Sequence, residues 1–386
     1  MTARQAIIGA RIFDGETWHD DRTLLVDGGA IAGIVDEGDR PDDVMTVDAS
    51  GQWLVPGFID LQVNGGGGVM LNDRQDVEGI RTICVAHAQF GTTALLPTLI
   101  TDTFEIRARA IAAGRQAKRD RVPGFLGLHL EGPHLSVARK GAHDPALIRP
   151  MDPADLDALL ACKGAFEAMM ITVAPENASV EQVAALADAG FIVSIGHTDA
   201  GYQSVCAYAA AGARTVTHLF NAMSPLGHRE PGVVGAALDR SDLYAGIIAD
   251  GFHVDPVSMG IALRAKAGPG RIFIVTDAMS TIGSEQTGFM LNGREIFRKD
   301  GRLTLADGTL AGADIDMLSS VRFVHEKLGL PLDEALRMAS AYPAQAARID
   351  RKKGRLLAGL DADFALLTPS LAMVSTWIGG VCVFKA

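Results

Sequence analysis

From residue 56 onward, short apolar runs alternate with longer segments of helical periodicity. The apolar runs have the length of buried strands, and there are eight of them: 58–63, 93–98, 125–130, 169–173, 191–195, 215–219, 244–248 and 272–276. Amphipathic segments of helical length lie between most of them: 76–90, 103–119, 180–189, 201–211 and 255–267. Buried runs that alternate with helices are typical of parallel strands joined by crossover helices. This pattern predicts an α/β protein with a (β/α)8 TIM-like barrel.

The two ends of the chain show a different pattern. Residues 6–12, 23–26, 30–35 and 45–48 read as short strands between turn signals, and residues 362–385 return to short strands. We therefore expect a small β-sandwich domain from residues 1–55 and 350–386, beside a barrel domain of residues 56–349. Such a domain requires the two ends of the chain to meet in space.

The segment after the eighth apolar run predicts further elements. Residues 289–305 resemble a β-hairpin region with turns at Asn292-Gly293 and Asp300-Gly301. Helical patterns follow at 315–328 and 332–347.

The amino-acid composition indicates which kinds of molecule the protein could bind. The chain has 386 residues, 48% of them hydrophobic, which is enough for a full globular core. Its net charge of −11 and the lack of a long basic run argue against nucleic acid or an anionic membrane as a partner and favour a small molecule. Four scattered cysteines without a CxxC pair, no signal-peptide pattern and no long apolar run predict a cytoplasmic protein.

Ligand-type side chains follow nearly every predicted strand. In a parallel barrel, the carboxyl ends of the strands meet at one mouth, where function collects. Glu131, His197 and His218 end three apolar runs, and a carboxylate that continues a buried strand is costly unless a cation meets it. One carboxylate and two imidazoles form a catalytic zinc-type set, which also suits Fe(II) or another divalent ion. Each residue alone could be structural, but that interpretation does not explain the three together.

Asp277 ends the eighth run, in IFIVTDAMS. As a structural residue it would cap the following helix; as a catalytic residue it would be the general base that accepts a proton from water. We favour the catalytic interpretation.

Other polar residues near these strand ends leave two interpretations open. His129 would lie one layer deeper in the barrel than Glu131, and His134 lies in the following loop, so neither is assigned to the metal. The loop residues are either solvated polar groups or substrate contacts, with Arg229 able to bind an anionic group: His143, Asn221, His228, Arg229 and His253.

The sequence resembles the amidohydrolase superfamily and, within it, the N-acetylglucosamine-6-phosphate deacetylases. The resemblance covers essentially the whole chain. It rests on PGFID and GRLLAGLDADFALL, and on a more specific set in a fixed order: HLEGPHLSVARKGAHD, GHTDAGY, THLFNAMSPLGHREPG, IADGFHVD, VTDAM and GTLAGA.

The resemblance implies roles for matching positions. Glu131, His197 and His218 would bind the metal, Asp277 would be the acid and base, and His143 would stabilise the oxyanion. Contacts with an amino-sugar phosphate are implied for Ala142, His143, Asn221, Ala222, Asp250, His253, Leu310, Ala311 and Gly312. Arg229 would bind the phosphate from the neighbouring subunit, which implies a homodimer that could pair into a tetramer.

Gln62-Val63-Asn64 replaces a pair of histidines that many amidohydrolases use to hold a second metal. Amides are poor substitutes for imidazoles around a zinc-like ion. We therefore expect one divalent ion per subunit, zinc first, with iron, cobalt or manganese as alternatives.

The expected reaction is hydrolysis of N-acetyl-D-glucosamine 6-phosphate to D-glucosamine 6-phosphate and acetate. The alternatives are deacetylation of N-acetylgalactosamine 6-phosphate, another amidohydrolase reaction such as cyclic-amide hydrolysis or deamination, and a catalytically inactive interaction protein. An inactive relative would be expected to have lost the residues that this chain keeps.

Overall fold

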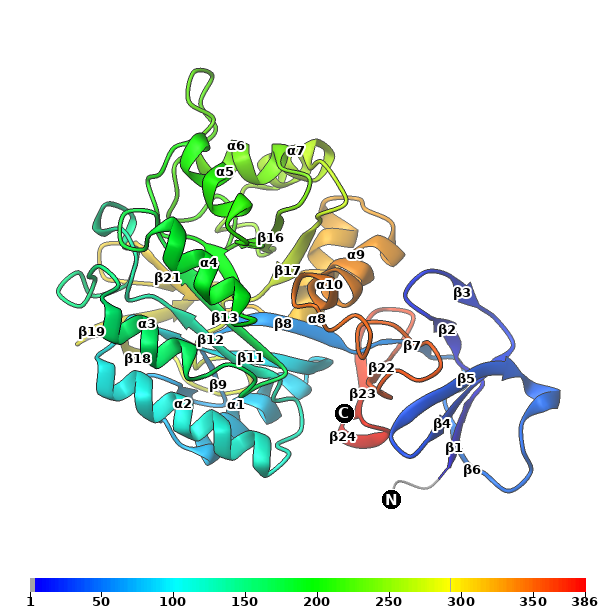
Figure 1. Ribbon diagram of the computed structural model, residues 1–386. Coiled ribbons are helices and arrows are strands. Elements are labelled where there is room, and N and C mark those ends of the chain that lie inside the picture. Colours follow the sequence, from blue (N-terminus) through cyan, green and yellow to red (C-terminus); the bar gives the residue numbers. More distant parts are fainter. Residues whose placement is uncertain (1–3, 292) are drawn as a thin grey trace.

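The computed structural model describes residues 4–291 and 293–386 (Figure 1). Asn292, where the sequence predicts a turn, and the first three residues lie outside this range. None of the described helices combines the length and the apolar content needed to cross a lipid bilayer.

Eight parallel strands form one sheet in chain order, which confirms the predicted barrel. They are β8 (Phe58–Val63), β11 (Thr92–Ile100), β12 (Gly127–Glu131), β13 (Ala168–Val173), β14 (Ile192–Ile195), β15 (Thr215–Val216), β16 (Tyr244–Ile248) and β17 (Ile272–Val275). Every residue in these strands is buried, because helices cover the outer face and side chains fill the inside.

The barrel closes where β8 meets β17. Asp277 N donates to Gln62 O at 3.0 Å, and Asn64 N donates to Ala278 O at 2.9 Å. Asp60, fully buried in β8, accepts from Thr276 N and Gln62 N, both at 3.2 Å. The first and last strands therefore join at their carboxyl ends.

Helices surround this sheet. They are α1 (Val77–Ala88), α2 (Phe104–Arg119), α3 (Pro153–Leu160), α4 (Val180–Asp188), α5 (Tyr202–Ala210), α6 (Gly232–Asp239), α7 (Pro256–Ala265), α8 (Met317–Arg322), α9 (Leu332–Ala339) and α10 (Ala341–Ala346). Many begin after a side-chain oxygen that accepts a backbone N–H of the first turn: Asp76, Thr103, Asp152, Ser179, Asp255 and Asp316. Helices α8, α9 and α10 pack against β17.

Strands from both chain ends form two further sheets beside the barrel. One contains β1 (Gln5–Ile8), β4 (Arg22–Asp27), β5 (Ala30–Asp36) and β6 (Met45–Asp48). The other contains β2 (Arg11–Phe13), β3 (Trp18–His19), β7 (Trp53–Pro56), β22 (Phe364–Leu367), β23 (Met373–Ile378) and β24 (Val381–Lys385). Because β22 pairs antiparallel with β7, the two ends of the chain meet as expected (Figure 1). The division into domains at residues 55/56 and 349/350 stays a prediction.

The glycine run after β8 forms a small hairpin that packs against α1, and the segment after β17 forms a small sheet that reaches the barrel mouth. Gly65–Gly66 (β9) pairs with Val69–Met70 (β10) through a turn at Gly67 and Gly68, both at positive φ. The predicted hairpin region is a four-stranded sheet: β18 (Gly288–Leu291), β19 (Arg294–Lys299), β20 (Arg302–Thr304) and β21 (Leu310–Ala313).

Several predicted boundaries were wrong. The run 6–12 is two strands in different sheets, because Gly9 bends the chain at φ +75°, where a Cβ atom would lie 2.4 Å from Ser50 Oγ. The run 215–219 is a strand only at Thr215–Val216. The helical pattern 332–347 breaks at Ser340, and the pattern 315–328 ends in a π-helical turn at Phe323–Lys327.

A buried charge cluster ties α2 and α3 to the loop after β12. Asp155 of α3 accepts from Arg107 of α2 at 2.7 Å and from Arg149 at 2.7 Å. The Asp155 side chain is 1% exposed and that of Arg107 is 5% exposed. Arg149 N donates to Pro133 O, and Arg149 O accepts from His134 Nδ1 at 3.1 Å. The cluster thus anchors the loop that leaves the barrel mouth.

We expect Asp155→Ala to lower the free energy of unfolding by about 3–5 kcal/mol, because it leaves Arg107 buried without a counter-charge. The matched control is Asp242→Ala, which removes the exposed partner of Arg240 (2.6 Å) and should cost at most about 1 kcal/mol. Urea unfolding of both variants measures the difference, and equal losses would contradict a special role for the buried cluster.

The difference in stability between the wild type and Asp155→Ala should depend on pH. Burial by itself would raise the pKa of Asp155, but hydrogen bonds from Arg149 and Arg107 outweigh it and hold the pKa well below 3.8. The stabilisation is therefore complete above the unfolded-state pKa and is lost as the pH falls through the lower folded-state pKa. The gap between wild type and Asp155→Ala should narrow in strong acid.

Candidate active site

The four residues that the sequence places at the mouth come from the ends of four strands. Glu131 is the last residue of β12, and His197, His218 and Asp277 each follow β14, β15 or β17 by two residues. The glutamate and both histidines are buried, whereas Asp277 is partly exposed. The structure therefore brings these four predicted residues together.

Three of these residues have an unusual backbone. His197, His218 and Asp277 have φ values of +49°, +27° and +52°, in the left-handed region that side chains with a Cβ atom avoid. Such positions cost on the order of 1–3 kcal/mol each and cluster at functional sites. The turn ends each strand and directs the side chain across the barrel mouth.

Three electron-pair donors converge there. Glu131 Oε1 lies 3.2 Å from His197 Nε2 and 3.2 Å from His218 Nε2, and the two nitrogens are 3.0 Å apart. A tetrahedral zinc site with bonds of about 2.0–2.1 Å places its ligand atoms roughly 3.3 Å apart. The spacing of the three donors therefore fits one small cation.

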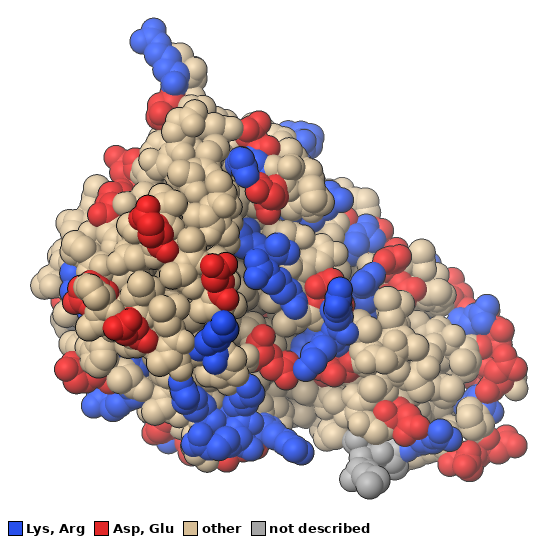
Figure 2. Space-filling model, in the orientation of Figure 1, with Lys and Arg blue, Asp and Glu red and all other residues tan. Residues whose placement is uncertain are grey.

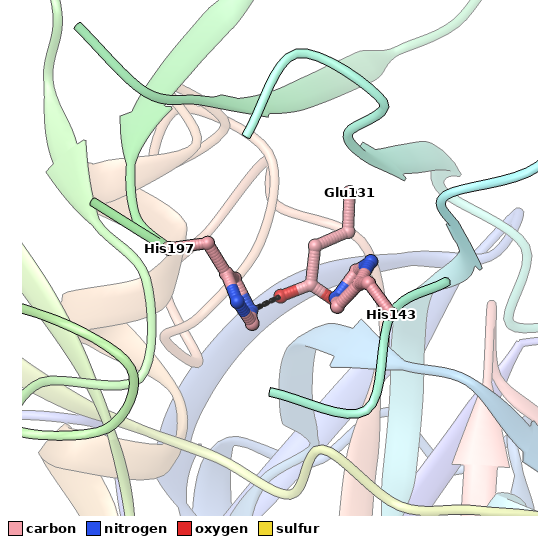
Figure 3. Close-up of side chains that lie close together, drawn as sticks. All are labelled: Glu131, His143 and His197. Atoms are coloured by element: carbon pink, nitrogen blue, oxygen red, sulfur yellow. Dashed lines mark hydrogen bonds and ion pairs between the residues drawn. The ribbon is translucent and has the colours of Figure 1, made fainter. Parts of the chain in front are cut away.

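The hydrogen bonds around His197 support this fit. Its Nδ1 donates to Arg139 O at 2.9 Å, because a carbonyl oxygen can only accept. In the neutral ring, Nε2 then keeps its lone pair and faces the Glu131 carboxylate (Figure 3). Two electron pairs in contact require a proton or a metal ion between them, so the donor set suits a divalent metal.

The charges of Glu131 and His218 are coupled. Burial by itself would raise the pKa of Glu131, but the adjoining imidazoles of His197 and His218 outweigh it and hold the pKa well below its usual range. Burial disfavours the charged form of His218, whereas the Glu131 carboxylate favours it. The carboxylate has the larger effect, so the pKa of His218 is raised. Each of the two side chains therefore favours the charged form of the other.

His143 also approaches this cluster, with Nε2 3.8 Å from Glu131 Oε2 (Figure 3). Glu131, His143 and His197 thus form a second group that could hold a metal. However, Thr101 N donates to His143 Nδ1 at 3.3 Å, so in the neutral ring Nε2 carries the proton. Burial lowers the pKa of His143 to about 3, which keeps the ring neutral. His143 therefore presents a hydrogen-bond donor, and His218 completes the better metal set.

The two amides at the end of β8, Gln62 in the strand and Asn64 just after it, bind the two carboxylates. Asn64 Nδ2 donates to Asp277 Oδ1 at 2.7 Å, and Gln62 Nε2 donates to Asp277 Oδ1 at 3.1 Å and to Glu131 Oε1 at 3.0 Å. Burial and the nearby charge of Glu131 raise the pKa of Asp277. The amide hydrogens of Gln62 therefore lie between the two carboxylates, and both amides bind the Asp277 carboxylate through Oδ1 alone.

These residues line a cavity of about 180 Å³. Most of the predicted site residues contribute to its wall: Glu131, Ala142, His143, His197, His218, Asn221, Ala222, His253, Asp277, Leu310 and Gly312. Three predicted residues lie outside it. Asp250 accepts from His253 Nδ1 at 2.6 Å, Ala311 is fully buried among apolar side chains, and Arg229 is exposed on a loop. Substrate contact by these three stays a prediction.

The model of the Amidohydrolase family matches residues 53–383. The chain belongs to the amidohydrolase family. The resemblance seen in the motifs is therefore confirmed.

Individual relatives of this amidohydrolase include two sugar-phosphate deacetylases. The N-acetylgalactosamine-6-phosphate deacetylase of Shewanella sp. (strain ANA-3) is 43% identical over 334 residues, covering 86% of this chain and 84% of that protein. The N-acetylglucosamine-6-phosphate deacetylase of Haemophilus influenzae is 37% identical over 380 residues, 98% of each chain.

Solved structures agree with this relationship. The crystal structure of N-acetylglucosamine-6-phosphate deacetylase from Pasteurella multocida matches with a TM-score of 0.95 and 36% identity, over 99% of this chain and 100% of that one. A mutant of the Mycobacterium smegmatis enzyme in complex with N-acetyl-D-glucosamine-6-phosphate matches with a TM-score of 0.90 and 29% identity, over 100% of both chains.

The amidohydrolase cavity also has a wall that the sequence did not reveal: Ile100, Gly141, Ile248, Met279 and Leu291. Ile100 and Ile248 are the last residues of β11 and β16. The sequence analysis searched strand ends for polar side chains, and it therefore missed these apolar residues. Leu291 and Met279 belong to a small apolar cluster under the β18–β21 sheet.

The two unassigned histidines lie away from the cavity. His129 is buried inside the barrel, where Nδ1 donates to Leu61 O at 3.1 Å and Nε2 lies 2.7 Å from Thr172 Oγ1. Burial lowers the pKa of His129 to about 4. His134 lies in the loop after β12, as the sequence predicts.

The choice between the two possible metal sets gives a direct test. We expect His218→Ala to weaken zinc binding by more than the roughly 10–100-fold that loss of an outer partner causes. His143→Ala removes only a hydrogen-bond donor and should stay within about tenfold of wild type. Competition with a chelator measures both affinities, and the opposite order would favour Glu131, His143 and His197 as the ligands.

Proposed function

We propose that this amidohydrolase removes the acetyl group from N-acetyl-D-glucosamine 6-phosphate, giving D-glucosamine 6-phosphate and acetate. The observation that carries the proposal is the convergence of Glu131, His197 and His218 within 3.2 Å, beside Asp277. The relatives with this name, which match nearly the whole chain, support the choice of substrate.

The proposal includes one divalent ion per subunit, held by Glu131, His197 and His218. Zinc is the first candidate, and iron, cobalt and manganese are alternatives, because one carboxylate and two imidazoles suit all of them. The amide hydrogens of Gln62 and Asn64, which point at the carboxylates, support a single ion. A bound divalent cation supplies Lewis-acid chemistry, which lowers the pKa of water and polarises a carbonyl group.

Asp277 is the proposed acid and base. Gln62 and Asn64 both donate to Oδ1, which leaves Oδ2 to accept a proton from the attacking water. The raised pKa of Asp277, caused by burial and by Glu131, suits a proton acceptor. Once protonated, the same side chain can donate that proton to the amine nitrogen as the carbon–nitrogen bond breaks.

His143 is proposed to stabilise negative charge on the acetyl oxygen. Its Nε2–H faces the cavity because Nδ1 accepts from Thr101 N. Removal of one such donor costs about 2.7–4 kcal/mol of transition-state stabilisation in other enzymes. The remaining predicted contacts, from Ala142, Asn221, Ala222, His253, Leu310 and Gly312, lie around the same cavity and would hold the sugar.

The galacto epimer is a second candidate substrate, because the Shewanella relative at 43% identity carries that name. Measurement of acetate release from both 6-phosphates separates the two. We expect turnover of the gluco sugar to exceed that of the galacto sugar. A reversed preference would show that the galacto epimer is the better substrate. Failure to release acetate from either sugar would contradict the proposed reaction.

Asp277→Asn is the control for this assay. It keeps the size of the side chain but cannot accept a proton, so we expect loss of at least the roughly 10²–10⁴-fold that general acid–base catalysis contributes. Zinc content should remain at the wild-type level. Near-normal acetate release by this variant would refute the proton role.

Arg229 is the proposed phosphate ligand, supplied by a neighbouring subunit of a homodimer. It lies on the loop before α6, which projects from the barrel at the top of Figure 1 and carries basic atoms at its tip in Figure 2. Residues 228–230 are all exposed, and Arg229 does not line the cavity of its own chain. A position far from its own site supports donation to another copy.

We expect Arg229→Ala to lower kcat/KM for the phosphorylated sugar by roughly 10- to 150-fold, the equivalent of a charged hydrogen bond worth about 1.5–3 kcal/mol. Activity on unphosphorylated N-acetylglucosamine should be unchanged, because that sugar offers no anion. The matched control is Arg119→Ala, at the end of α2 on the outside of the barrel. Equal losses of activity on both sugars would contradict the proposal that Arg229 recognises the phosphate.

The proposal also places the enzyme in the cytoplasm. The free thiols of Cys84, Cys162, Cys206 and Cys382 support a reducing compartment. Cell fractionation would test this location.

A further inference from the structure

His143 lies in an irregular loop, between a 3-10 turn at Val137–Arg139 and helix α3. A loop holds a side chain less precisely than a helix or a strand does. The His143 ring is nevertheless buried, and it packs edge-on against the ring of His197 with the two ring centroids 4.4 Å apart. The orientation of this ring must therefore come from contacts with other elements.

Thr101 makes such a contact with Nδ1 of His143. The Thr101 hydroxyl oxygen lies 2.8 Å from Nδ1, and the backbone N–H of Thr101 donates to the same atom at 3.3 Å. Because an N–H group can only donate, Nδ1 carries a lone pair. A hydroxyl that faces this lone pair at 2.8 Å must donate as well, although Glu131 O lies 3.3 Å away as a second acceptor. Thr101 thus binds the ring through two donors.

Thr101 is itself held in place by the barrel. It directly follows β11 and is 1% exposed. The side-chain amide of Asn72 extends the strand, because Ile100 N donates to Asn72 Oδ1 at 3.1 Å and Asn72 Nδ2 donates to Ile100 O at 3.2 Å. Gly132 leaves room for the hydroxyl group, since a Cβ atom there would clash with Thr101 Oγ1. The hydroxyl therefore links a histidine in a loop to a fixed barrel strand.

We propose that Thr101 is a positioning residue for the deacetylation: its hydroxyl keeps the ring proton of His143 on Nε2 and directs this N–H into the cavity. This rests on the role of His143 proposed above. In the other tautomer, Nε2 would present a lone pair to the developing negative charge and could not stabilise it. Thr101 does not line the cavity, so its hydroxyl acts on the rate through His143.

The first test compares Thr101→Val, which removes the hydroxyl, with Thr101→Ser, which keeps it. We expect Thr101→Val to lower kcat for acetate release by about tenfold, near the upper end for one neutral hydrogen bond, with KM little changed. Thr101→Ser should stay close to wild type. The matched control is Thr376→Val, because the buried Thr376 hydroxyl donates to Ala88 O away from the cavity. Equal losses of kcat in Thr101→Val and in either Thr101→Ser or Thr376→Val would overturn the proposal.

A double-mutant cycle shows through which residue Thr101 acts. Once His143→Ala has removed the ring, the further change Thr101→Val should not lower kcat, because the hydroxyl has nothing left to orient. Competition with a chelator should give Thr101→Val the zinc affinity of the wild type. Independent losses of kcat in the cycle, or a weakened zinc affinity, would mean that Thr101 acts through Glu131 and would overturn the proposal.

A measurement without substrate separates this inference from the proposed reaction. Nitrogen-15 NMR of the zinc-loaded protein with labelled histidine distinguishes protonated from unprotonated ring nitrogens, and His143→Ala identifies the His143 signals. We expect the proton on Nε2 in the wild type and partly on Nδ1 in Thr101→Val. A proton on Nδ1 in the wild type, or identical signals in the two proteins, would overturn the role of Thr101. A wild type with the expected tautomer that releases no acetate would contradict the proposed reaction alone.

Discussion

Three buried electron-pair donors, on Glu131, His197 and His218, repel one another unless a cation or proton lies between them. Each donor comes from a different strand, so their separation of 3.0–3.2 Å exists only while the barrel holds β12, β14 and β15 in register. The strained turns at His197 and His218 show that the fold tolerates unfavourable backbone geometry to keep the rings in place. The barrel and the metal set are therefore mutually dependent: the strands supply the spacing, and a cation would relieve the repulsion.

The closure of the barrel explains how the carboxylates are kept apart chemically. Because β8 joins β17, the amides of Gln62 and Asn64 reach Asp277, and Gln62 also reaches Glu131. The amide hydrogens of Gln62 thus occupy the space in which the two negative groups would otherwise face each other. This arrangement leaves Asp277 with one free carboxylate oxygen, which the proposed proton transfer requires.

Hydrophobic periodicity was enough to locate the strands and hence the residues at their ends, because fully buried strands leave a clear pattern in the sequence. It failed where local geometry depends on contacts. The turn at His218 shortens β15, and α6 was missed because it is buried on nearly all sides and has no polar face. The hydrogen bonds from Thr101 that make His143 a donor join residues far apart in sequence. The sequence alone therefore cannot predict them.

The amide pair at the end of β8 also has a genetic consequence. Glutamine and asparagine codons each differ from a histidine codon by a single base, so two point mutations in the gene would convert Gln62 and Asn64 into the paired imidazoles found elsewhere in the superfamily. If the site holds one ion as proposed, conversion of this position to a histidine pair would therefore require only two base changes and no change to the scaffold.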